Sequence, residues 1–105
     1  MDAQEQRMLL ELAAKAAGYK VYDGGKLFWI WKDSNVEWVD WNPLTDDGDA
    51  LRLAIDLELD VSLGKSGAVV EFGRLQIEEL DASDPYAAVR LAIVRAAAAI
   101  GEKMK

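Results

Sequence analysis

Apolar residues recur at intervals of three or four positions in three stretches of the chain, near residues 2–17, 46–57 and 85–100. This spacing places apolar side chains on one face of a helix, so it predicts three helices. A residue that favours an N-cap stands at or just before the start of each stretch, namely Asp2, Thr45 and Asp84. Gly18 and Gly101 follow the first and third stretches and are expected to end those helices. The buried face of the second helix is expected to consist of Leu51, Leu53, Ala54, Ile55 and Leu57.

Between the helical stretches, runs of aromatic and β-branched residues alternate with turn signals, which is typical of strands. Six runs predict strands: Tyr19–Tyr22, Leu27–Trp31, Val36–Val39, Leu59–Leu63, Ala68–Phe72 and Leu75–Glu79. Gly73 stands at the first position of a two-residue turn, which favours a type II′ hairpin. Because the connections within each group of strands are short, we expect antiparallel pairing. Residues 27–31 are apolar on both faces, so this strand should be covered by helices above and below.

Together these elements predict an α+β protein with the architecture of an α/β/α sandwich. A mainly antiparallel sheet of four to six strands is expected to lie between layers formed by the three helices. The chain has 105 residues, of which 51% are hydrophobic, so it is long enough to bury a core without disulfides. No linker or low-complexity stretch divides it, and residues 1–105 are expected to form a single domain.

The composition argues against an enzyme. The chain contains no cysteine and no histidine, which removes thiolate chemistry, the usual general base near neutral pH and the commonest transition-metal ligand. The serines lack an evident partner base in the sequence, and Gly64–Gly67 is interpreted as a hairpin turn because the upstream glycine of a phosphate loop is missing. We therefore expect no catalytic residues and no cofactor, while metal-dependent activity through carboxylates stays open.

No apolar run approaches the roughly 20 residues that span a bilayer. The first residues are polar and acidic and show no signal-peptide pattern. These features predict a soluble, cytoplasmic protein without a membrane partner.

The formal charge of −7 is concentrated in the middle of the chain. Between residues 40 and 60, only Arg52 opposes seven acids: Asp40, Asp46, Asp47, Asp49, Asp56, Glu58 and Asp60. Such a protein repels a phosphate backbone, so no nucleic-acid partner is expected. An alternative is an acidic decoy that occupies the nucleic-acid-binding site of another protein. That alternative requires the acids to be aligned on one face.

Three of these acids, Asp46, Asp47 and Asp49, are weak candidates for a divalent metal site, because Ca²⁺ and Mg²⁺ prefer oxygen ligands. The run lacks the ligand spacing of a calcium loop. Capping and the helix dipole explain acids in a first turn without a metal. We therefore predict no metal site here and keep an aspartate-bound metal as an alternative. Asp49 and Arg52 are spaced for an ion pair on the helix.

Aromatic residues and arginines supply the candidates for a binding surface. Trp29, Trp31 and Trp38 are expected to fill the space between sheet and helices, as large side chains in a small domain usually do. Trp41 stands at the corner between a strand and a helix, where an exposed ring is more plausible. Arg90 and Arg95 lie on the alanine-rich last helix, so the candidate interaction surface consists of Trp41, Arg90 and Arg95.

Three strings of the sequence, residues 41–54, 84–88 and 93–98, resemble the phage ABA sandwich domain, a family of small phage and prophage proteins. The resemblance covers about residues 38–101. It implies an α/β/α sandwich and an origin in a phage or prophage, hence the cytoplasm of a bacterial host. It implies no catalytic or binding residues. The resemblance and the lack of recognisable catalytic residues together predict a small accessory protein that acts by binding an unknown protein, either another chain or a second copy of itself.

Overall fold

The computed structural model describes residues 1–23, 28–31 and 39–104, and for residues 22, 23, 28–31 and 39 it describes the backbone only. The fold is α+β, as predicted. In chain order its elements are α1 (Ala3–Ala17), β1 (Lys20–Asp23), β2 (Phe28–Trp31), β3 (Val39–Trp41), α2 (Asp47–Asp56), β4 (Asp60–Gly64), β5 (Gly67–Phe72), β6 (Leu75–Leu80) and α3 (Pro85–Lys103). The predicted filling role of three tryptophans is not tested, because Trp38 and the side chains of Trp29 and Trp31 lie outside the described part.

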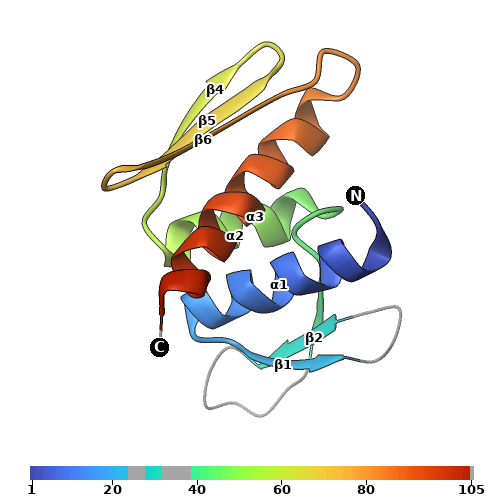
Figure 1. Ribbon diagram of the computed structural model, residues 1–105. Coiled ribbons are helices and arrows are strands. Elements are labelled where there is room, and N and C mark those ends of the chain that lie inside the picture. The colour runs from blue at the N-terminus through green and yellow to red at the C-terminus, as the bar shows by residue number, and fades with distance from the viewer. Residues whose placement is uncertain (24–27, 32–38, 105) are drawn as a thin grey trace.

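The described strands form two antiparallel sheets of three strands, ordered β1-β2-β3 and β4-β5-β6. The expectation of one sheet with four to six strands is therefore not confirmed, because the six described strands belong to two sheets. Figure 1 shows the helices between the two sheets, with β4–β6 at one end of the molecule and β1 and β2 beside α1 at the other. The predicted α/β/α order, with a sheet between helices, is not confirmed.

The two faces of the sheet β4–β6 explain why it needs helices on one side only. Val61, Val70 and Ile77 are cross-strand neighbours on the inner face, and Val70 is completely buried. The cross-strand row Asp60, Glu71 and Gln76 lies on the outer face and is exposed. A half-polar antiparallel sheet is stable with one face in water, so no second helical layer is required.

Helix α3 is the centre of the packing. It contacts α1, α2, β5 and β6, and its alanines 92, 96 and 97 are completely buried. Gly101 does not end this helix as predicted, because the helix continues to Lys103 and buries Gly101 against α1. A Cβ atom at position 101 would lie 2.0 Å from the backbone oxygen of Leu12. Glycine at this position therefore allows the backbones of α1 and α3 to touch.

The predicted N-caps of α1 and α3 and the predicted C-cap of α1 are confirmed. The Asp2 carboxylate accepts the backbone N–H of Glu5, and Gly18 ends α1 with a φ of 76°. The Asp84 carboxylate caps α3, with Pro85 in its first turn. The two-residue turn between β5 and β6 is also as predicted, with Gly73 at a φ of 61°.

The bounds of α2 lie close to the predicted 46–57, but its N-cap differs from the prediction. The N-cap is Asp46 rather than Thr45, since Asp46 Oδ1 accepts the backbone N–H of Gly48 at 3.0 Å. At the other end Glu58 has a φ of 56°, while the N–H of Leu59 donates to the carbonyl of Ala54 at 2.9 Å. Glycine usually occupies such a left-handed position, so glutamate gave no stop signal in the sequence.

The contact between α1 and α3 predicts a large effect of adding one methyl group. In the interior of an exposed helix, replacing glycine by alanine stabilises the protein. Gly101→Ala should instead lower the free energy of unfolding by about 1–3 kcal/mol, because the added carbon overlaps the backbone of α1. Gly64→Ala is the matched control, expected within about 0.5 kcal/mol of wild type because the nearest atom to its Cβ is an ordinary contact. Urea unfolding measures both, and a G101A protein as stable as wild type would contradict the close approach.

Candidate functional site

Trp41 is buried where β3 leads into α2. Its residue surface is only 3% exposed, and its ring meets that of Tyr19 edge to face, with centroids 5.8 Å apart. The prediction that Trp41 belongs to an interaction surface is therefore wrong. The corner position did not keep the indole exposed, because this ring joins the core between β3, α2 and the start of β1.

The three aspartates at the start of α2 have three different partners. Asp46 caps the helix, and Asp47 forms an ion pair with Arg90 at 2.5 Å. Asp49 is 8% exposed and accepts the backbone N–H of Asn42 at 2.9 Å and the guanidinium of Arg52 at 2.8 Å. The predicted Asp49–Arg52 pair is thus confirmed. Within the described ranges, no group of three acidic residues is arranged to hold a metal ion.

The Asp49 carboxylate connects the first turn of α2 to the end of β3, because it accepts the backbone N–H of Asn42. Asp49→Ala removes the acceptor of the Asn42 N–H, so it should lower the free energy of unfolding by about 1–3 kcal/mol. Asp60→Ala is the matched control, because Asp60 is exposed on the outer face of β4, and its effect should stay within about 0.5 kcal/mol. Thermal unfolding compares the two variants. Equal stability of D49A and D60A would show that the Asp49 contacts do not hold this corner.

Tyr19 links the start of β1 to the end of α2. Its hydroxyl donates to the Asp56 carboxylate, and burial together with this bond raises the pKa of Tyr19 well above its usual range. The folded state therefore holds the phenolic proton more tightly than the unfolded chain does. The resulting stability is complete below about pH 10 and is lost as the pH rises toward the raised pKa.

A comparison of two tyrosine variants tests this linkage. From about pH 9 to about pH 11, the free energy of unfolding should fall less in Tyr19→Phe than in wild type, because the variant has no phenol at that position to ionise. Tyr86→Phe should keep the wild-type slope, since Tyr86 is 70% exposed. Urea unfolding at several pH values gives the slopes, and identical slopes for Y19F and wild type would contradict the assignment.

Arg90 and Arg95 lie on different sides of α3. Arg90 faces α2, where its Nε donates to the carbonyl of Leu44 at 2.8 Å and its head group pairs with Asp47. Arg95 faces the sheet and pairs with Glu79 of β6 at 2.6 Å. The predicted surface of Trp41, Arg90 and Arg95 is therefore not formed as one patch. Of these three residues, only Arg90 borders the cavity described next.

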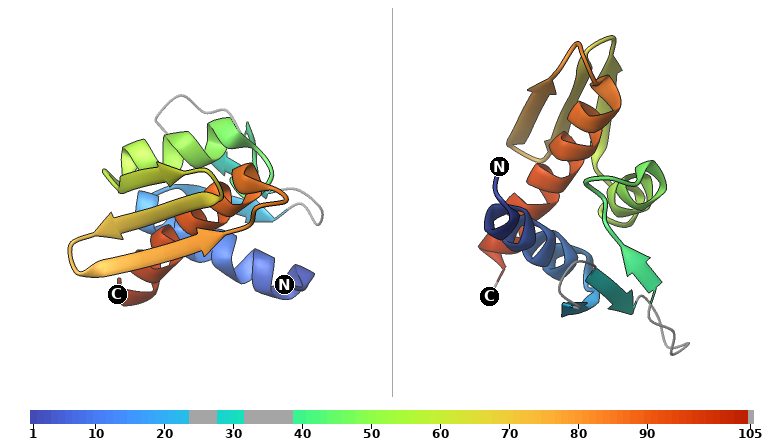
Figure 2. Two further views of the ribbon diagram at one scale, coloured as in Figure 1. Left: turned by 90° about the horizontal axis from the view of Figure 1, so that it is seen from above. Right: turned by 90° about the vertical axis from the view of Figure 1, so that its right-hand side faces the viewer.

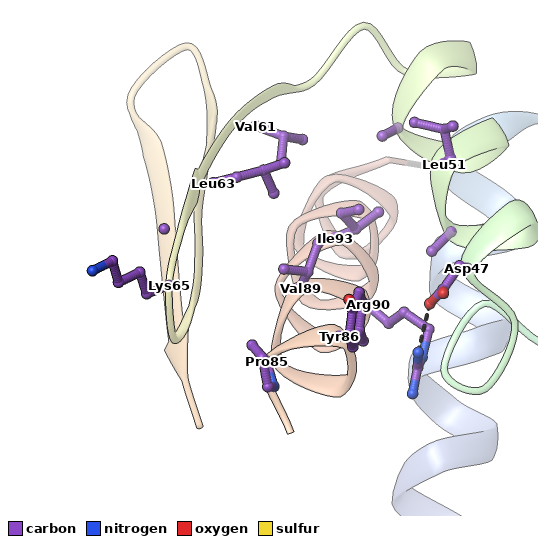
Figure 3. A pocket seen from close by; sticks show the side chains of 13 residues that line it. Asp47, Leu51, Val61, Leu63, Lys65, Pro85, Tyr86, Val89, Arg90 and Ile93 are labelled. Atoms are coloured by element: carbon purple, nitrogen blue, oxygen red, sulfur yellow. Dashed lines mark hydrogen bonds and ion pairs between the residues drawn. The ribbon is translucent and has the colours of Figure 1, made fainter. Parts of the chain in front are cut away.

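A groove of about 640 Å³ that is open to a ligand lies between β4, α2 and α3. Figure 3 shows Val61 and Leu63 on the β4 wall, Leu51 on the α2 wall and the side chains of α3 along the floor. Most of the lining is apolar, including Leu51, Val61, Leu63, Tyr86, Val89 and Ile93. We call this surface the α2–β4 groove.

The exposure of the groove residues distinguishes it from ordinary surface. Leu51 is 60% exposed, Leu63 is 73% exposed and Tyr86 is 70% exposed. Single exposed apolar side chains are common, but several around a concave surface make that surface a candidate binding site. The charged groups at its border are the Asp47–Arg90 pair and Lys65. The residues that line the groove include no serine, threonine, cysteine or histidine, so the lining offers hydrophobic contact and a few charges.

Two apolar residues of α2 could have indicated this groove, but the helical pattern of the sequence assigned them to the core. Leu51 and Ile55 were both expected in the buried face of α2, yet they are 60% and 63% exposed. The residues of α2 that are buried are Ala50, Leu53 and Ala54, together with Asp49. The apolar surface of α2 is wider than the area that its neighbour α3 covers. The width of this apolar surface in the sequence was therefore the signal that part of it stays exposed.

No family model, curated protein or solved structure matches the chain. The resemblance to the phage ABA sandwich domain thus stays a prediction. No helix in the described residues is long and apolar enough to cross a membrane.

Proposed function

We propose that this protein is a non-catalytic protein–protein interaction module and that the α2–β4 groove is its binding surface. The observation that carries the proposal is the exposed apolar rim of Leu51, Leu63 and Tyr86 around a concave, mainly apolar surface. Covering these side chains removes apolar area from water, at roughly 25 cal/mol per Å². The resemblance stated above supports the further proposal of a phage or prophage accessory protein in the cytoplasm of a bacterial host.

The two alternatives have less support from the described residues. An acidic decoy requires the acids of residues 40–60 to be aligned on one face, whereas three of them, Asp47, Asp49 and Asp56, are bonded to Arg90, Arg52 and Tyr19 at separate places. An aspartate-bound metal requires converging oxygens, whereas Asp46, Asp47 and Asp49 serve three different partners. Both proposals therefore rank below a protein-binding groove.

Affinity capture with matched variants tests the proposed function. The immobilised protein is exposed to a lysate of the organism that encodes it, in parallel with Leu51→Lys, which places a charge in the groove. Met8→Lys is the control, because Met8 is similarly exposed, at 56%, but lies on α1 outside the groove. The proposal predicts a protein retained by wild type and M8K and reduced at least about tenfold by L51K, since charged residues are strongly disfavoured in the core of an interface.

Circular dichroism and urea unfolding first establish that both variants fold like wild type. Capture of the same proteins by wild type and L51K would contradict the proposal, because binding would then not depend on the groove. Loss of capture by M8K alone would assign the interaction to α1 instead.

A further inference from the structure

The free backbone edge of β4 borders the α2–β4 groove. Among the described residues, β4 pairs with β5 alone, so its other edge has no strand beside it. An unpaired edge presents a row of backbone N–H and C=O groups that can pair with another strand. Strand β4 also carries Leu63, which at 73% is the most exposed large apolar side chain in the described part of the molecule.

Helix α2 lies beyond the edge of β4, where it would cover the inner face of any strand added to the sheet β4–β6. In the view from above, β6, β5, β4 and α2 follow one another across the molecule (Figure 2). Helix α3 packs against β5 and β6, while α2 packs against α3 beyond the edge of β4. The sheet β4–β6 is therefore narrower than the pair of helices beneath it. A strand added to β4 would lie over the groove and cover Leu51 of α2.

The groove and the outer sheet face set the chemistry of such a strand. Alternate side chains of a strand point to opposite faces. Those that point inward would meet Val61, Leu63 and the floor of the groove, so they must be apolar. Those that point outward would continue a sheet face that carries three exposed acids, Asp60, Glu71 and Glu78, so they are favoured by positive charge.

A second copy of this chain fits the edge less well. Its sheet, if joined through its own β4, would bring its own α3 to the same side of the combined sheet. Helices pack about 8–10 Å apart, and α2 already occupies that region beyond β4. The two chains would also each carry a net charge of −7. A partner segment that is extended, alternating and basic avoids both problems.

We propose that β4 accepts an extended segment of a partner protein as a fourth strand, with apolar side chains in the α2–β4 groove and lysine or arginine side chains on the outer face. This inference rests on the proposed function and specifies the partner of the same groove. Backbone pairing with β4 gives affinity, and the pockets for alternate side chains give specificity.

Synthetic peptides test the inference on the full chain. The probe is a capped peptide of about seven residues in which lysine and valine alternate. We expect a dissociation constant on the order of 0.1 mM, since ordering a flexible peptide opposes binding. We also expect slower amide hydrogen exchange in β4. A peptide of the same sequence, with methyl groups on the backbone nitrogens that face β4, should bind at least about tenfold more weakly, because it cannot complete the ladder.

Two charge reversals on the outer face provide matched protein variants. Asp60 lies on β4, beside the proposed strand, and its cross-strand neighbour Glu71 lies one strand farther away on the same face. Asp60→Lys should weaken binding of the lysine–valine peptide about fivefold, whereas Glu71→Lys should weaken it less than about twofold. A peptide that alternates glutamate and valine should bind wild type more weakly than the lysine–valine peptide.

Each other result overturns the inference in a recognisable way. Equal binding of the methylated peptide would exclude backbone pairing, and tighter binding of an amphipathic helical peptide of lysine and leucine would show that the groove accepts a helix. In both cases the groove stays a binding site, and the proposed function survives.

Sedimentation that shows a dimer, lost in Leu63→Lys, would assign the edge to a second copy. No binding of the lysine–valine peptide at millimolar concentration also overturns the inference, while the capture experiment decides the proposed function separately.

Discussion

The close approach of α1 and α3 is the constraint on which the rest of the structure depends. Buried alanines along α3 and Gly101 near its end leave room for the backbone of α1 at one side and for the sheet β4–β6 at another. Because its side chains are small, α3 can be packed on several sides at once. The helices consequently lie between the two sheets (Figure 1). The third neighbour of α3 is α2, which covers only part of the remaining surface. The side chains of Val89 and Ile93 consequently line an open groove.

The parts of the fold that depend on neighbouring residues could be predicted from the sequence. The caps at Asp2 and Asp84 and the hairpin turn at Gly73 are each determined by a few adjacent residues, and all three are found in the structure. The division of the strands into two sheets depends on contacts between distant segments, which a periodic pattern does not specify. Gly101 illustrates the same limit, because its role is to accommodate Leu12 of another helix rather than to end its own.

The candidate site shows how burial and partners decide what a residue does. Trp41, Arg90 and Arg95 were predicted as one surface from their residue types, but Trp41 is in the core and the arginines pair on different sides of α3. The Asp49–Arg52 pair was correctly expected, since it joins residues one helical turn apart, whereas the pairing of Asp47 with the distant Arg90 was not. The groove was missed because Leu51 gives the same helical pattern whether its face is covered or open.

Native-state hydrogen exchange, measured residue by residue at increasing urea concentration, tests the central role of α3 most directly. If α3 holds the molecule together, the amides from Ala92 to Ala98 exchange only on global unfolding, and those of β4 exchange through smaller local openings. This order follows from the burial of α3 by four neighbours and the pairing of β4 on one side. Exchange of the α3 amides before those of β5, by an opening that leaves the sheet β4–β6 intact, would contradict the account.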